Sequence, residues 1–204
     1  MKKLDLKLIL FDSYGVVLFG GYPDTCRYLG KKFKRDWQEL YEVIYKKYFN
    51  IAAERKISQQ EAWQKSTREL GLDITVSEIK KIHYGFMSVN QKVLSTVKKL
   101  QKQYKVALLT KNTRSQLADT TKRFSALKAT FGKNLLNTWE YGLPKASLQT
   151  IRFVCQKYSV KPNEILYIDD QEANLEPAKK LGAKTIFYKN FNQFKGELRE
   201  YIYA

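Results

Sequence analysis

The 204-residue chain is poor in cysteine, proline, glycine and histidine, with 2, 4, 10 and 1 residues respectively. Cys26 and Cys155 form neither a metal-ligand spacing nor a disulfide framework. Low glycine and proline beside 14% aromatic residues exclude a disordered or low-complexity chain. No uncharged apolar stretch reaches the ~20 residues that span a bilayer, and residues 1–7 lack the apolar stretch of a signal peptide. We therefore expect a cytoplasmic protein without a membrane partner.

The charge of the chain is strongly positive, at +17. Residues 24–81 contain thirteen Lys or Arg against nine acids, whereas residues 91–133 contain eleven against Asp119 alone. Such a stretch can attract phosphates or nucleic acid. Lysine dominates over arginine there and aromatic residues are few, which favours a solvated surface over a base-stacking site. Nucleic acid is thus not the expected partner, although the basic stretch keeps it open as an alternative.

The order of expected elements indicates an α/β fold. Residues 6–11 form a short apolar run that ends at Asp12, typical of a buried parallel strand. After residue 90, helical patterns alternate with apolar runs at residues 106–110, 165–168 and 184–188. This alternation predicts a doubly wound, Rossmann-like parallel sheet with helices on both faces.

Between the first strand and this alternation, the pattern is helical only. Ser58 and Glu61 form a capping box for one helix, and His83, the only histidine, falls on another, where we expect a partly buried structural residue. The sequence therefore predicts an α/β core of residues 1–18 and 89–204 with an inserted α-helical cap of residues 19–88.

Polar residues end three of the expected strands: Asp12, Thr110 and the pair Asp169 and Asp170. In doubly wound sheets, ligands bind at the carboxyl ends of the strands. Carboxylates that converge there repel one another unless a cation lies between them, and Mg²⁺ prefers such oxygen ligands. The Thr110 hydroxyl and the Lys145 ammonium could then bind the remaining oxygens of a phosphate.

These residues resemble the four motifs of the haloacid dehalogenase (HAD) superfamily. The motifs read Asp12-Ser13-Tyr14-Gly15, Thr110, Lys145, and Asp169-Asp170 with Asn174 and Gly182. The last block is similar to the helical-cap class, especially the amino-terminal phosphatase domain of soluble epoxide hydrolases and small sugar-phosphate phosphatases. The resemblance covers nearly the whole chain.

The resemblance implies a role for each residue. Asp12 would be the nucleophile and, with the backbone carbonyl of Tyr14, Asp169 and Asp170, would hold Mg²⁺. Thr110 would bind the phosphoryl group, and Lys145 would neutralise it. Asn174 would orient the acidic loop. Lys111 and Asn112 would contact the substrate. The implied reaction is hydrolysis of a small phosphorylated metabolite through an aspartyl-phosphate on Asp12.

Three positions depart from the pattern of the family's phosphatases. Tyr14 stands where they normally have the aspartate that protonates the leaving group, and loss of a general acid–base typically costs ~10²–10⁴ in rate. Val16 replaces a usual threonine, and Lys111 replaces a common asparagine.

Two alternatives follow from these departures. The Asp-x-Tyr-Gly motif also resembles L-2-haloacid dehalogenases, in which the aspartate attacks carbon without a metal. Paired acids such as Asp169 and Asp170 are unusual in those enzymes, so we favour phosphoryl chemistry. The second alternative is a non-catalytic module that binds an anionic partner through its basic surface.

Overall fold

The computed structural model describes residues 5–202, which form two compact units. The first, here called the α/β unit, comprises the residues up to Leu18, Val89–Lys111 and the residues from Ser125 onward. The second, here called the helical unit, comprises Phe19–Ser88 and Asn112–Phe124. The chain thus passes between the units four times.

A five-stranded parallel sheet forms the centre of the α/β unit, in the order β5-β4-β1-β6-β7. The expected Rossmann-like α/β fold is confirmed. The strands are β1 (Leu8–Asp12), β4 (Lys105–Thr110), β5 (Leu135–Asn137), β6 (Ile165–Asp169) and β7 (Lys184–Phe187). The three-residue β5 is too short to leave a periodic signal in the sequence, and it was not expected. The central strand β1 is buried along its whole length, as its uninterrupted apolar run predicts.

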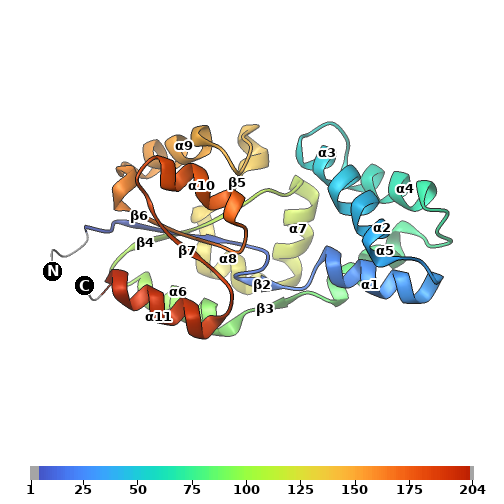
Figure 1. Ribbon diagram of the computed structural model, residues 1–204, viewed down its shortest axis with the longest axis horizontal. Helices are drawn as coiled ribbons and strands as arrows, with labels where there is room; N and C mark the ends of the chain where they lie inside the picture. The colour runs from blue at the N-terminus through green and yellow to red at the C-terminus, as the bar shows by residue number, and fades with distance from the viewer. Residues whose placement is uncertain (1–4, 203–204) are drawn as a thin grey trace. The chain divides into compact units, whose positions relative to one another are not determined.

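Helices cover both faces of this sheet (Figure 1). One face is covered by α9 (Leu148–Tyr158) and α10 (Glu172–Lys180), the other by α6 (Gln91–Leu100), α8 (Ser125–Phe131) and α11 (Phe191–Ile202). Short 3₁₀ turns are η2 (Gly132–Asn134), η3 (Thr138–Tyr141) and η4 (Pro162–Glu164), and the linking segments β2 (Leu18–Phe19) and β3 (Ser88–Val89) pair as a small sheet.

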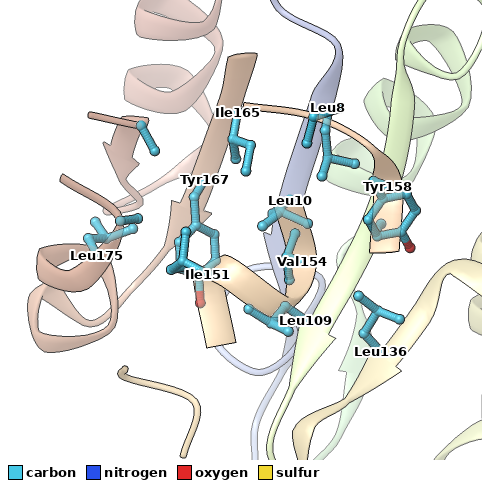
Figure 2. Packing of buried hydrophobic residues seen from close by; sticks show 14 residues of the cluster. Leu8, Leu10, Leu109, Leu136, Ile151, Val154, Tyr158, Ile165, Tyr167 and Leu175 are labelled. Atoms are coloured by element: carbon cyan, nitrogen blue, oxygen red, sulfur yellow. The ribbon is translucent and has the colours of Figure 1, made fainter. Parts of the chain in front are cut away.

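Alternate residues of the strands face the two helical layers. Leu8, Leu10 and Leu109 pack with Ile151 and other side chains of α9 and α10 (Figure 2). On the opposite face, the rings of Phe11 and Phe194 meet edge to face with centroids 5.9 Å apart. Both layers are therefore apolar, and polar side chains gather at the strand ends.

The helical unit has a core of its own around the fully buried Trp63. Its elements are α1 (Tyr22–Phe33), α2 (Trp37–Tyr41), the π-helical η1 (Glu42–Phe49), α3 (Asn50–Ala53), α4 (Gln59–Glu69), α5 (Val76–Gly85) and α7 (Arg114–Arg123). The expected capping box of α4 is present, with Ser58 and Glu61 bonded to each other's backbone. Within residues 5–202, no helix combines the length and the apolar character that a bilayer crossing requires.

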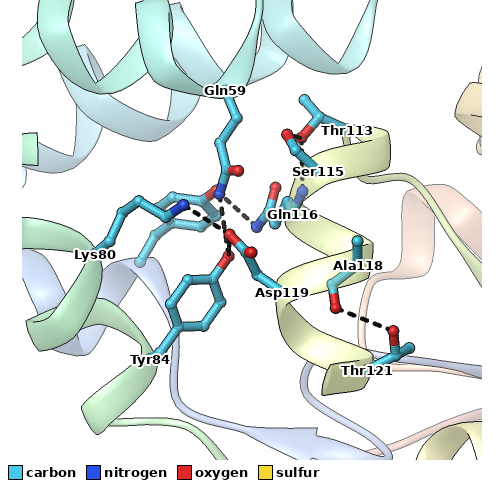
Figure 3. Close-up of polar contacts among 10 residues, drawn as sticks. Gln59, Lys80, Tyr84, Thr113, Ser115, Gln116, Ala118, Asp119 and Thr121 are labelled. Carbon is cyan, nitrogen blue, oxygen red and sulfur yellow. Dashed lines mark hydrogen bonds and ion pairs between the residues drawn. The ribbon is translucent and has the colours of Figure 1, made fainter. Parts of the chain in front are cut away.

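Helix α7 belongs to the helical unit, although the sequence analysis assigned residues 112–124 to the core. Polar contacts explain the difference (Figure 3). Gln116 Nε2 donates to the Tyr22 hydroxyl at 2.8 Å, and Asp119 accepts from the Tyr84 hydroxyl and pairs with Lys80 at 2.7 Å. These partners lie about 35 or more positions away along the chain, so no local pattern could indicate them.

Candidate active site

The site lies at the carboxyl edge of the sheet in the α/β unit. Asp12 is the last residue of β1, and Asp169 is the last residue of the neighbouring β6. Carboxylate oxygens of Asp12, Asp169 and Asp170 all lie within 4.8 Å of one another. The tertiary structure thus brings together the three acids that the sequence analysis singled out.

The Asp12 carboxylate is buried and held by two donors. Its Oδ1 accepts from the backbone amide of Ser13 at 2.6 Å and from Lys145 Nζ at 2.6 Å. The turn that follows is closed by backbone bonds from Val17 and Leu18 to the Ser13 carbonyl. Burial raises the pKa of Asp12, while the ammonium of Lys145 opposes the shift. The neighbours of Asp12 therefore fix its orientation, and its burial disfavours the charged form of the carboxylate.

Lys145 joins Asp12 to Asp169, with its Nζ 2.8 Å from Asp169 Oδ2. The loop that presents it is fastened to the start of α9, since both Ser147 and Thr150 donate hydroxyl bonds to the Pro144 carbonyl. Burial alone would lower the pKa of Lys145, but the two carboxylates raise it above its ordinary value. The side chain therefore stays charged.

Asp169 is surrounded by further hydrogen-bond donors. The Tyr167 hydroxyl donates to its Oδ2 at 2.6 Å, and the amide of Gln171 and the Asn174 side chain donate to its Oδ1 at 2.9 and 3.0 Å. With Lys145 as the fourth donor, both oxygens are occupied. Asp169 is thus held at both carboxylate oxygens, and one of its donors is Asn174, which the family resemblance expects to orient the acidic loop.

Asp170 is the acid whose oxygen lacks a partner. Its Oδ1 is buried and has no hydrogen-bond partner among residues 5–202. Burial, and then the charge of Asp169, raise the pKa of Asp170. Its other oxygen lies against Gly15, where a Cβ would come within 1.9 Å of Oδ2. Gly15 has a φ of +87°, a conformation that glycine adopts without strain.

A divalent cation fits this cluster. Three carboxylates against one ammonium leave a formal charge of −2 at a site where Asp12 and Asp169 are buried and Asp170 is half-buried, which is costly without a counter-charge. The unpartnered Asp170 Oδ1 is a ligand atom of the hard oxygen type that Mg²⁺ prefers. The residues present are therefore suited to hold a metal ion.

Four other residues that the family resemblance singles out are buried or half-buried: Thr110, Tyr14, Lys111 and Asn112. Thr110 is buried at the end of β4, and Tyr14 and Lys111 are half-buried within the α/β unit. Asn112 is buried but groups with the helical unit. The roles of Thr110, Tyr14, Lys111 and Asn112, including the Tyr14 carbonyl as a metal ligand, stay predictions.

Two residues of the site had no assigned role in the sequence analysis: Tyr167 and Gly15. Tyr167 lies two positions before Asp169 on the same strand, and the period-2 rule puts both side chains on one face. That spacing was a usable signal. The requirement for a glycine at position 15 could not be inferred from the sequence, because it comes from the close approach of Asp170, which is 155 positions away.

Comparison with known families agrees with this geometry. The model of the haloacid dehalogenase-like hydrolase family matches residues 6–182. The chain belongs to this family. The bifunctional epoxide hydrolase 2 of Rattus norvegicus is 26% identical over 140 residues, covering 64% of this HAD-like chain and 25% of that enzyme. The chain thus spans about a quarter of the length of the curated relatives it matches.

Solved HAD structures share the fold of this chain. The HAD family enzyme BT-2542 from Bacteroides thetaiotaomicron superposes with a TM-score of 0.79 at 20% identity, covering 95% of this chain and 98% of that one. BT-2542 has also been solved with magnesium and inorganic phosphate. The L-2-haloacid dehalogenase PA0810 superposes with a TM-score of 0.66 at 18% identity, covering 93% and 87%. At these identities the likeness shows the fold alone.

Proposed function

We propose that this HAD-family hydrolase is a Mg²⁺-dependent phosphatase that acts on a small phosphorylated metabolite through an aspartyl-phosphate on Asp12. The observation that carries the proposal is the cluster of the buried Asp12 and Asp169 with the half-buried Asp170. With Lys145 it has a formal charge of −2, and one of its carboxylate oxygens has no hydrogen-bond partner within residues 5–202. BT-2542, which shares the fold, has been solved with magnesium and inorganic phosphate, and this supports a metal-dependent reaction on a phosphate group.

The metal would be held by Asp12, Asp170 and the Tyr14 carbonyl, with Asp169 acting directly or through water. When bound, it would supply positive charge for the non-bridging oxygens of a phosphoryl group. Asp170 is the more suitable direct ligand of the pair, because both oxygens of Asp169 already accept hydrogen bonds.

Asp12 and Lys145 would perform the chemistry. The Asp12 carboxylate attacks phosphorus, the bond from phosphorus to the leaving oxygen breaks, and water then hydrolyses the acyl phosphate. The Lys145 ammonium, 2.6 Å from Asp12, offsets charge on the nucleophile and on the transferred group. Thr110 would donate its hydroxyl to a phosphoryl oxygen.

Tyr14 sets the expected substrate preference. An ordinary tyrosine has a pKa of about 10, so it is a poor acid–base near neutral pH. The enzyme should therefore favour substrates whose leaving group needs little protonation. The rate should rise with the acidity of the leaving group, and equal rates on alkyl and aryl phosphates would contradict this preference.

Hydrolysis of p-nitrophenyl phosphate, with and without Mg²⁺, tests the proposal. That leaving group departs without an acid, so Tyr14 should not mask activity. Asp12→Asn should abolish turnover, whereas Asp73→Asn, an exposed acid of the helical unit, should leave it unchanged. Turnover that is independent of Mg²⁺ or survives in Asp12→Asn would contradict the mechanism.

A second candidate is dehalogenation of a 2-haloacid, with Asp12 attacking carbon. It is favoured by the Asp12-Ser13-Tyr14-Gly15 motif and by the fold shared with PA0810. The negative cluster argues against it, because it would repel a carboxylate substrate. Chloride release from 2-chloropropionate without a metal, with no phosphatase activity, would favour this reading. Absence of both activities would leave the non-catalytic alternative.

A further inference from the structure

A groove lies on the α/β unit away from the acidic cluster. Its walls are α6, the segment after it, and α11, which run beside each other on one face of the sheet (Figure 1). It encloses about 700 Å³, within the roughly 300–1,000 Å³ typical of small-molecule pockets. The proposed hydrolysis uses none of its residues.

Among residues 5–202, the charged side chains that line the groove are all positive. Its five charged lining residues are Lys92, Lys99, Lys102, Lys195 and Arg199. Within residues 5–202, none of the five forms an ion pair with an acid. Uncompensated charges in a concave site attract an anion more strongly than charges on an open surface.

The charges of α11 are separated by helix face. Lys195 and Arg199, one turn apart, line the groove, whereas the acids Glu197 and Glu200 of the same helix do not. Helix α6 contains no acid at all. On α11 the cations therefore line the groove and the acids do not, whereas the positive charge on the α6 side follows from the basic stretch of residues 91–133.

Apolar side chains line part of the groove, beside the polar Gln91, Ser95, Thr96 and Gln103. Leu100 and Leu198 are buried at its floor, and Ile202 adds a further aliphatic side chain. The Phe191 ring lies under the Lys92 ammonium, 5.8 Å from the ring centroid. Within residues 5–202 the lining aromatic residues are Phe191 and Tyr104, and neither is among the exposed large apolar side chains, which disfavours a base-stacking platform for nucleic acid.

We propose that this groove binds a small amphipathic anion, with an acidic group held by Lys195, Arg199 and Lys99 and an apolar body lying over Leu100 and Leu198. Charge complementarity selects an anion, and the apolar floor selects one with a hydrophobic part. A second copy of this chain is disfavoured at this face because like charges would meet.

The test uses 8-anilinonaphthalene-1-sulfonate, a fluorescent amphipathic anion, beside N-phenyl-1-naphthylamine, which has the same rings without the sulfonate. The groove variant is Lys99→Glu with Lys195→Glu. Its control is Lys98→Glu with Lys180→Glu, which changes net charge equally at exposed lysines outside the groove. We expect the groove variant to weaken binding of the anion at least tenfold, and the control less than twofold.

Several results would overturn the proposal. These are equal loss in both double variants, equal affinity for the uncharged probe, or tighter binding of a single-stranded oligonucleotide that displaces the dye. Loss of dye binding in Asp12→Asn would place the dye at the acidic cluster and would equally count against the groove. Retained dye binding in Asp12→Asn supports the groove, whether or not that cluster proves to be a phosphatase site.

Discussion

At the scale of single residues, the carboxylate of Asp170 leaves no room for a side chain at Gly15. Gly15→Ala should abolish Mg²⁺-dependent turnover, because the new Cβ would lie 1.9 Å from Asp170 Oδ2 and displace it. Gly182→Ala is the matched control: alanine is equally strained at its φ of +91°, but apart from its chain neighbours no heavy atom of the described residues lies within 4 Å of the new Cβ. Turnover assays and thermal unfolding of both variants separate backbone strain from loss of the site. Equal turnover in the two variants would contradict the prediction.

Tyr167 is the second residue whose role comes from the structure. Tyr167→Phe should lower the free energy of unfolding by about 1.5–3 kcal/mol, because it removes a hydrogen bond to the charged, buried Asp169. Tyr158→Phe removes a bond to the neutral Asn134 in the same core and should cost only about 0.5–1.5 kcal/mol. Urea unfolding measures both. A Tyr167 variant as stable as the Tyr158 variant would show that the contact with Asp169 adds nothing.

At the scale of elements, helix α5 holds His83 against α1 in the core of the helical unit. His83 is fully buried, more completely than the sequence suggested. Thr25 donates its hydroxyl to the Gly21 carbonyl and so accepts from His83 Nδ1 at 3.0 Å, while Nε2 has no partner within residues 5–202. Burial lowers the pKa of His83 to about 3. The residue is therefore a neutral structural histidine.

This burial predicts acid sensitivity. The unfolded chain takes up the His83 proton below about pH 6.5 and the folded chain only near pH 3, so stability falls as the pH drops between these values. Between pH 7 and pH 5 the loss should be about 2 kcal/mol. His83→Asn should show a correspondingly shallower decline in urea unfolding, since all other titrating groups are shared. Parallel declines would refute the assignment.

Helix α7 shows which properties of a helix depend on neighbouring residues in the sequence and which depend on distant ones. Its start was predictable from Thr113, whose hydroxyl accepts from the Gln116 amide. The Gln116 side chain, by contrast, donates through Nε2 to the hydroxyl of Tyr22, 94 positions away along the chain. Helix position thus followed from local sequence, whereas the unit to which the helix belongs followed from distant partners.

At the scale of the whole molecule, the net charge of +17 opposes general accumulation of cations. A saturable effect of Mg²⁺ should therefore come from the acidic cluster. Mg²⁺ at 100 times its dissociation constant should stabilise the protein by about 2.7 kcal/mol, measured as a higher unfolding midpoint against NaCl of equal ionic strength. Asp170→Asn should remove this stabilisation. An equal gain with NaCl would assign it to ionic strength.

The sequence by itself determined four of the five strands of the parallel sheet, most helices and the chemical types at the strand ends. Apolar runs, helical periodicity and capping residues act over a few positions, and parallel strands necessarily bring their carboxyl ends to one edge. The resemblance to the family motifs then implied roles for Asp12, Lys145, Asp169 and Asp170.

Only the tertiary structure decided which hydrogen-bond partners and neighbours those groups have. It distinguished the saturated Asp169 from the unpartnered Asp170, placed Asp170 against Gly15, and joined α6 and α11 around a basic groove. These features depend on pairs of residues far apart in the chain. Their distances are set by packing of whole elements, which no local pattern encodes.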